Sequence, residues 1–284
     1  KYVILGVTGP NEYENNVNNN WYTNYIAKWC LTYALEAHHQ VCNNSSTLLK
    51  KKEDELWSDI IEKMYLPTIK GTSIFLQNDG YLDKKQQSVS DIPKDEKPIN
   101  QHWSWDRILR SCYIKQADVL QGLYFFEENF NKDILVDNFN FYEPKTVHES
   151  SLSPCVHSIL ATKINQTEKA YQLYLRTSRL DLDDYNHEAD EGLHITSMAG
   201  TWLAIIEGFA GVKIKNQELH LYPNLPKHWK SIDFNIRVQN NPLNIHINQQ
   251  QAKVKNNGDD SVIINYGDNL KETINTKAYL TITI

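Results

Sequence analysis

The segment from Gly192 to Trp202, Gly-Leu-His-Ile-Thr-Ser-Met-Ala-Gly-Thr-Trp, combines groups that can bind an anion. His194, Thr196 and Ser197 stand where an acidic loop passes into an apolar, helical pattern. The first turn of a helix offers backbone N–H groups and the positive end of the helix dipole. We therefore expect these three residues to bind a phosphate-like anion, with Thr196 or Ser197 as the helix N-cap.

A second segment of the same kind, His-Glu-Ser-Ser-Leu-Ser-Pro, runs from His148 to Pro154. Serine followed by proline is typical of a helix start, with Ser153 as the N-cap and proline at the first helical position. Capping explains Ser153, but it does not explain Ser150 and Ser151. Two hydroxyl-rich helix starts, each with a histidine, indicate a binding site for a dianion. The alternative for each of them is that the hydroxyls only cap the helix.

A candidate general acid lies near the N-terminus, in the segment 9–13, Gly-Pro-Asn-Glu-Tyr. Glycine and proline predict a rigid turn that holds Glu12 against aromatic neighbours such as Tyr13 and Trp21. A carboxylate in that setting loses solvation, which favours the protonated form that a general acid needs near neutral pH. The alternative is an ordinary surface glutamate in a loop.

Lys115 and Gln116 begin a helical pattern that is otherwise apolar. A cation and an amide at the open end of a buried helix could bind sugar hydroxyls or an anion, whereas the alternative is that Lys115 simply reaches solvent. His157, His187 and His220 have no comparable setting, and we assign them to the structure or the surface.

The composition excludes several function classes. Of the 284 residues, 40% are hydrophobic and 23% are charged, and the net charge is −6. The sequence has no stripe of basic residues, so we do not expect a nucleic-acid partner. No apolar run approaches the roughly 18 residues that a membrane span requires. The four cysteines form no C-x-x-C pair, so we expect no metal site, reduced thiols and a cytoplasmic protein. The first residues read as the middle of a longer polypeptide, of which we expect this chain to be the C-terminal piece.

Hydrophobic periodicity predicts a mainly α chain that ends in a small antiparallel β-sheet domain, with domains at 1–210 and 211–284. The expected helices span 20–38, 45–64, 108–112, 116–130, 154–164, 166–178 and 196–208. Near Gly211 the period changes from 3.6 to 2. The expected strands centre on 212–214, 219–221, 234–238, 243–247, 262–264 and 280–283.

These segments together have a recognisable pattern. The chain resembles the C-terminal half of glycoside hydrolase family 65, and most closely its maltose phosphorylases. The matching segments are 9–20, 98–109, 115–119, 142–157 and 192–211, in the order that the family has them. The resemblance implies the C-terminal part of an (α/α)6 barrel followed by a small antiparallel β-sheet domain, which agrees with the periodicity.

The resemblance also implies roles for individual residues. Glu12 matches the general acid of the family, Lys115 and Gln116 match its substrate-binding pair, and the phosphate-binding residues match Ser150, Ser151, His194, Thr196 and Ser197. The implied reaction is an inverting phosphorolysis, which converts maltose and phosphate into β-glucose 1-phosphate and glucose. Phosphate is then a co-substrate, no other cofactor is implied, and a homodimer is expected from the family.

The chain departs from the family pattern at four positions near the acid, where Asn11, Glu14, Asn15 and Asn18 replace Asp, His, Glu and Asp. These changes leave the acceptor sugar open, so that kojibiose, nigerose or trehalose are alternatives to maltose. A trehalase-like hydrolase is a further alternative, because Asp190 and Glu191 could supply a base. The alternative outside the enzymes is a non-catalytic, sugar-binding relative.

Overall fold

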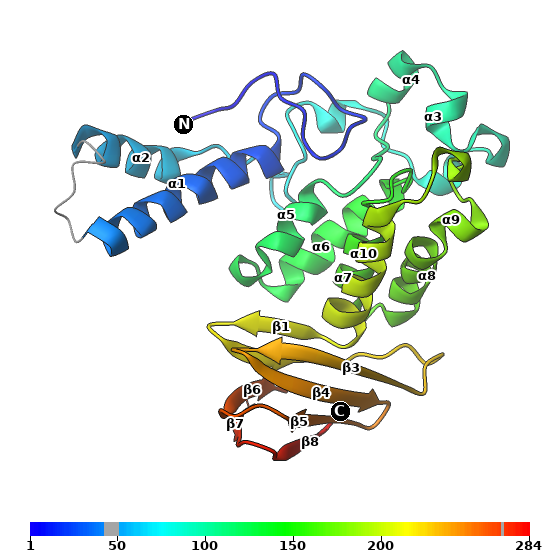
Figure 1. Cartoon of the computed structure of the whole chain (residues 1–284). Coiled ribbons are helices and arrows are strands. Elements are labelled where there is room, and N and C mark those ends of the chain that lie inside the picture. Colours follow the sequence, from blue (N-terminus) through cyan, green and yellow to red (C-terminus); the bar gives the residue numbers. More distant parts are fainter. Residues whose placement is uncertain (43–50, 268–269) are drawn as a thin grey trace. The chain divides into compact units, whose positions relative to one another are not determined.

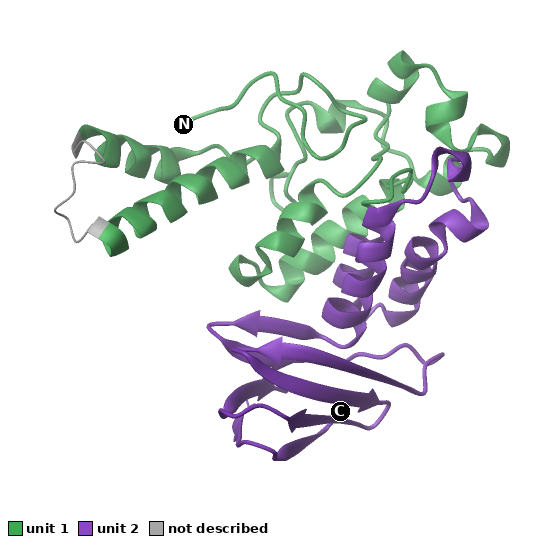
Figure 2. Cartoon of the chain, viewed as in Figure 1, with its two compact units in different colours: residues 1–153 green, residues 154–284 purple. Residues whose placement is uncertain are grey.

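The computed structural model describes residues 1–42, 51–267 and 270–284 (Figure 1). The chain divides into two compact units, Lys1–Ser153 and Pro154–Ile284 (Figure 2). The helix predicted over 45–64 starts outside the described residues, and its described part is helical. Among the described residues, no helix is both long and apolar enough to cross a membrane.

The first unit is built from helices and irregular loops. Its α-helices are α1 (Trp21–Cys42), α2 (Lys51–Lys63), α3 (Ile99–His102), α4 (Trp105–Leu109), α5 (Val119–Phe125) and α6 (Lys132–Tyr142). Five short 3-10 turns join them, at Tyr81–Asp83, Val89–Asp91, Lys94–Glu96, Glu127–Asn129 and Glu143–Lys145. The loop at residues 1–20, which contains the candidate acid, precedes α1 directly.

Aromatic residues at four-residue spacing explain the position of α1. The Trp21 ring is fully buried and stacks on Phe75 and Tyr25, with ring centroids 4.5 and 5.0 Å apart. At Gly122 of α5 an added Cβ would lie 2.6 Å from the Trp21 ring, so only glycine lets α5 approach α1 so closely. This contact fixes the start of α1, and with it the end of the preceding loop.

The second unit begins with a group of helices. They are α7 (Pro154–Lys163), α8 (Thr167–Ser178), α9 (Leu180–Asp183) and α10 (Ile195–Leu203), with a 3-10 turn at Ala189–Glu191 and a π-helical segment at Ala204–Phe209. Gly200 lets α10 pack on α7, because an added Cβ would lie 2.8 Å from Cβ and Sγ of Cys155.

Two four-stranded sheets complete the second unit. The strands are β1 (Val212–Lys215), β2 (Glu218–Leu221), β3 (Ser231–Val238), β4 (Asn241–Asn248), β5 (Gln251–Asn256), β6 (Val262–Tyr266), β7 (Leu270–Ile274) and β8 (Tyr279–Thr283). The first sheet has the order β1-β2-β6-β7 and the second β3-β4-β5-β8. Strands β2 and β6 pair in parallel, and the other pairs are antiparallel.

The predicted class, helices followed by a small antiparallel-rich sheet region, is confirmed. Two of the predicted helices had wrong bounds at both ends. The helix expected over 108–112 is α4, which starts at Trp105 because Ser104 accepts a hydrogen bond from the N–H of Arg107 as its N-cap. The helix expected over 116–130 starts only at Val119, because residues 114–118 form an irregular loop held by other partners. It ends at Phe125, before the 3-10 turn at Glu127–Asn129.

Candidate active site

The loop that carries Glu12 is fastened on both sides of that residue. Asn11 is fully buried, and its Oδ1 accepts hydrogen bonds from the N–H of Lys115 (2.9 Å) and of Tyr13 (3.2 Å). Tyr13 is also buried and turns inward. Because the residues before and after it point into the protein, Glu12 points outward.

The Glu12 carboxylate forms an ion pair with the Nζ atom of Lys115. The Glu12 side chain is 55% exposed and that of Lys115 is 26% exposed. The expectation that Glu12 is desolvated by aromatic neighbours was therefore wrong, since Tyr13 and Trp21 are both turned into the core. Lys115 contacts a carboxylate instead of simply reaching solvent.

Gln116 lies on the other side of the same loop. Its Nε2 donates a hydrogen bond to the carbonyl oxygen of Pro10 (2.9 Å), and only 8% of the residue is exposed. Its Oε1 has no hydrogen-bond partner among the described residues, which leaves one acceptor unused. The structure thus brings together Glu12, Lys115 and Gln116, three of the predicted site residues, from segments about 100 positions apart.

Asp118 is a site residue that the sequence analysis missed. Its carboxylate accepts hydrogen bonds from the N–H of Asn11 (3.1 Å) and from Nδ2 of Asn20 (3.0 Å), and only 3% of the residue is exposed. Burial raises the pKa of Asp118 to about 7 although both hydrogen bonds lower it, and the charge of Glu14 raises it further. The signal in the sequence was a single acidic residue inside an apolar run.

Gly9 is tightly enclosed by the side chains of Asn20 and Asp118. An added Cβ would lie 2.4 Å from Nδ2 of Asn20 and 2.5 Å from Oδ2 of Asp118. Because both neighbours are buried and hydrogen-bonded to each other, neither can move away cheaply. The glycine that the sequence suggested as a turn former is therefore required for close packing.

The four departures from the family pattern lie in different settings. Asn11 and Glu14 are buried, whereas Asn15 and Asn18 are exposed. Glu14 forms an ion pair with Lys84, and burial raises the pKa of the Glu14 carboxyl although this lysine lowers it. Glu14 therefore anchors the loop to the segment that follows the turn at Tyr81–Asp83.

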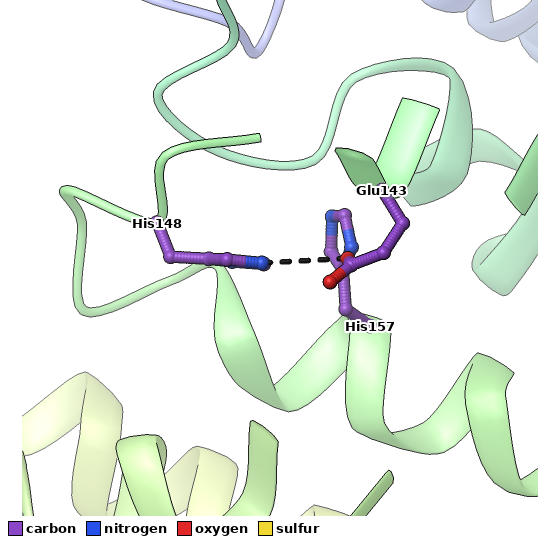
Figure 3. Close-up of side chains that lie close together, drawn as sticks. All are labelled: Glu143, His148 and His157. Carbon is purple, nitrogen blue, oxygen red and sulfur yellow. Dashed lines mark ion pairs between the residues drawn. The ribbon is translucent and has the colours of Figure 1, made fainter. Parts of the chain in front are cut away.

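The hydroxyl-rich turn in the first unit is held by its own side chains. Nδ1 of His148 lies 2.7 Å from Oγ of Ser153, and its Nε2 lies 3.4 Å from a carboxylate oxygen of Glu143 (Figure 3). Helix α7 starts at Pro154, as predicted. Ser150 and Ser151 are half-buried in the turn, and Oγ of Ser150 accepts a hydrogen bond from the N–H of Leu152 (3.2 Å).

Glu149, between that histidine and those serines, was also missed. It is 4% exposed, and its oxygens accept hydrogen bonds from the N–H groups of Ile99 (2.6 Å) and Asn100 (3.2 Å) and from the hydroxyl of Tyr13. The residue therefore connects the hydroxyl-rich turn with the loop of the candidate acid. Spacing in the sequence could not reveal this, because the two segments are 136 positions apart.

In the second unit, His194 is oriented by carboxylates. Its Nδ1 lies 2.5 Å from Oδ1 of Asp181, its backbone N–H donates to Oδ2 of Asp181 (3.0 Å), and its Nε2 lies 3.9 Å from Glu188. Although burial raises the pKa of Asp181, the hydrogen bonds from His194 outweigh that effect and lower it. Asp181 therefore fixes the ring of His194 through two contacts.

The other two residues of this segment differ in exposure. Thr196 is exposed, whereas Ser197 is buried and its hydroxyl donates to the carbonyl oxygen of Thr177 (2.7 Å). The expectation that Thr196 or Ser197 caps the helix was wrong, because α10 already starts at Ile195 and His194 occupies the N-cap position. The two predicted phosphate segments belong to different units, and their convergence on one anion stays a prediction.

Comparison with known proteins identifies the family of this chain. Residues 1–203 match the model of the glycosyl hydrolase family 65 central catalytic domain, and residues 212–270 match that of the family's C-terminal domain. The chain is 53% identical to a maltose phosphorylase of Bacillus subtilis over 89% of its own length. It is 41% identical, over 89% of its length, to an α,α-trehalose phosphorylase of Thermoanaerobacter brockii.

A solved structure supports the same assignment. It is named "Putative kojibiose phosphorylase from human microbiome", is 36% identical to this chain and superimposes with a TM-score of 0.89 over 100% of this chain and 38% of the other. The chain spans about a third of the length of the curated relatives, namely 34% of each of the two enzymes above. On the evidence of both family models and of these relatives, the chain belongs to glycoside hydrolase family 65.

Proposed function

We propose that this chain carries the acid and phosphate-binding residues of a disaccharide phosphorylase that acts on maltose. The observation that supports this proposal most strongly is the assembly of Glu12, Lys115 and Gln116 in one place. An outward-facing carboxylate, a cation and an amide with a spare acceptor are the groups that an acid and sugar site requires. The 53% identity to a maltose phosphorylase favours maltose.

In the proposed reaction, Glu12 donates a proton to the glycosidic oxygen as the bond between that oxygen and the anomeric carbon breaks. An oxygen of phosphate forms a new bond to the anomeric carbon from the opposite face, which inverts its configuration. The products are β-glucose 1-phosphate and glucose. The anion is itself the nucleophile, so the protein needs hydrogen-bond donors on that face and no second carboxylate.

The donors assigned to phosphate are Ser150, Ser151, His194 and Thr196. Ser197 was predicted with them, but its hydroxyl donates to the carbonyl oxygen of Thr177, so we assign it to holding this segment in place. The half-buried serines lie in a turn that precedes a helix, and His194 occupies the N-cap of another. Both positions are next to the positive end of a helix dipole, which favours an anion. The location that we propose is cytoplasmic, because Cys112 and Cys155 are buried free thiols.

Replacement of Glu12 tests the proposal in the full-length protein. Glu12→Gln keeps the size of the side chain and removes the proton donor, so we expect maltose phosphorolysis to fall by about 10²–10⁴-fold. The matched control is Glu218→Gln, which breaks a similar glutamate–lysine pair, with Lys271, in the sheet. Unchanged turnover in Glu12→Gln would exclude Glu12 as the acid and would favour a non-catalytic relative.

A panel of disaccharides tests the substrate. We expect the highest rate with maltose and lower rates with kojibiose, nigerose and trehalose. A higher rate with one of these three would reassign the acceptor while leaving the reaction unchanged, since the departures at Asn11 and Glu14 are next to the acid.

A further inference from the structure

Three hydrogen-bond donors converge on the carboxylate of Glu149, and they come from two other parts of the first unit. The N–H groups of Ile99 and Asn100, in the first turn of α3, donate to its two oxygens at 2.6 and 3.2 Å. The hydroxyl of Tyr13 donates to Oε2, which also receives the bond from Asn100. A buried carboxylate that accepts three hydrogen bonds in this way is held firmly in position.

Two residues of this network, Tyr13 and Glu149, are next in the sequence to residues with a proposed catalytic role. Tyr13 follows Glu12, the proposed acid, and Glu149 precedes Ser150 and Ser151, which are proposed to bind phosphate. Tyr13 is 2% exposed and its ring packs edge-on against Trp105, with centroids 6.2 Å apart. The hydroxyl of Tyr13 therefore has little freedom to move, and its bond to Glu149 links the acid loop to the phosphate turn.

We propose that Glu149 is a positioning residue that sets the spacing between the proton donor and the bound phosphate. This inference rests on the proposed function of Glu12 and of the two serines. In an inverting displacement, the leaving oxygen and the attacking oxygen lie on opposite sides of the anomeric carbon. A displacement of about 1 Å between the two groups can reduce the rate by about 10²-fold, so a rigid link between them contributes to catalysis.

Two variants separate the two ends of this link. Glu149→Gln keeps the shape of the side chain but leaves one oxygen for three donors, so it loosens both the acid loop and the phosphate turn. Tyr13→Phe removes only the hydroxyl at the acid end. The matched control is Tyr142→Phe, because Tyr142 is equally buried and donates its hydroxyl to the carbonyl oxygen of Phe75 at 2.5 Å.

The experiment uses two substrates in the full-length protein, maltose and α-glucosyl fluoride. Fluoride leaves without help from an acid, so the rate with this substrate reports on phosphate alone. For Glu149→Gln we expect kcat on maltose to fall by about 10- to 100-fold and the KM for phosphate to rise by about 10-fold with both substrates. For Tyr13→Phe we also expect kcat on maltose to fall. The KM for phosphate, measured with α-glucosyl fluoride, should not change in this variant.

The double variant tests whether the two residues act together. If they do, its loss of kcat on maltose is about the same as that of Glu149→Gln alone, because Glu149→Gln already removes the carboxylate to which the Tyr13 hydroxyl donates. The proposal would be overturned if the fold-losses of kcat in the two single variants multiply in the double variant. It would also be overturned if Glu149→Gln has the same kinetics as the control Tyr142→Phe. Failure of the proposed function has a different signature, since Glu12→Gln would then retain activity whatever the Glu149 variants do.

Discussion

Replacing Asp118 by asparagine should change how the stability of the chain depends on pH. The carboxyl is buried, and burial raises its pKa from 3.8 to about 7. The unfolded chain releases this proton near pH 3.8, whereas the folded chain retains it up to about pH 7. The folded state therefore binds more protons between these values, and its free energy of unfolding falls by about 1.4 kcal/mol for each pH unit as the pH rises.

The expected magnitude follows from this difference. Between pH 5 and pH 9, Asp118 should cost the wild-type chain about 3 kcal/mol of stability, with most of the loss below pH 7 and a plateau above pH 8. Asparagine cannot ionise, so the variant lacks this loss. It also offers one acceptor oxygen where the carboxylate serves Asn11 and Asn20, which costs about 1–3 kcal/mol at every pH.

Urea denaturation of both proteins at pH 5, 6, 7, 8 and 9, at constant ionic strength, measures the difference. We expect the Asp118→Asn variant to be less stable at pH 5, and the gap to close or reverse by pH 9. A suitable control is Asp59→Asn, because hydrogen bonds from Lys63 and Tyr2 lower the pKa of Asp59, which is then ionised in both states throughout this range. A gap for Asp118→Asn that stays constant from pH 5 to pH 9 would refute the reasoning.

Three further substitutions test the packing and the phosphate turn. Gly9→Ala should lower kcat on maltose by about 10-fold or more, measured by glucose release, because the new Cβ would lie 2.5 Å from Asp118 and shift the acid loop; an unchanged kcat would contradict this. Gly200→Ala should destabilise the second unit by about 1–3 kcal/mol in a thermal melt, because Cβ would meet Cys155 at 2.8 Å; an unaltered melt would show that α10 can relax. Ser151→Ala should raise the KM for phosphate by about 10-fold and leave the KM for maltose unchanged, since a hydrogen bond to a charged group contributes about 1.5–3 kcal/mol; the reverse pattern would place the hydroxyl at the sugar.

Much of the fold could be predicted because the hydrophobic period is clear in most elements. Helices α1, α7 and α8 start and end within a few residues of the prediction, and six of the eight strands were expected. Strands β5 and β7 were missed because they have few apolar residues to mark a pattern, since Ala252 and Val254 are the buried apolar positions of β5 and Ile274 is the one buried position of β7. Helix α6 was missed because its apolar residues, Ile-Leu-Val and Phe-Asn-Phe, form runs instead of a regular helical stripe.

The site was only partly predictable, for a different reason. Residue types and motif spacing indicated Glu12, Lys115 and Gln116, but the ion pair between Glu12 and Lys115 depends on tertiary contacts across 103 positions. Asp118 and Glu149 were missed because neither has a local partner that explains a buried carboxylate. Their hydrogen-bond donors come from loops that only the folded chain brings near them.

The stoichiometry and anomeric form of the products test the central claim most directly. Maltose cleavage by the full-length protein would be followed by proton NMR in the presence and absence of inorganic phosphate. The proposed function predicts that one phosphate is consumed for each maltose cleaved, that β-glucose 1-phosphate is the first sugar phosphate, and that no cleavage occurs without phosphate. Release of two glucose molecules at the same rate without phosphate would contradict it and would identify a hydrolase.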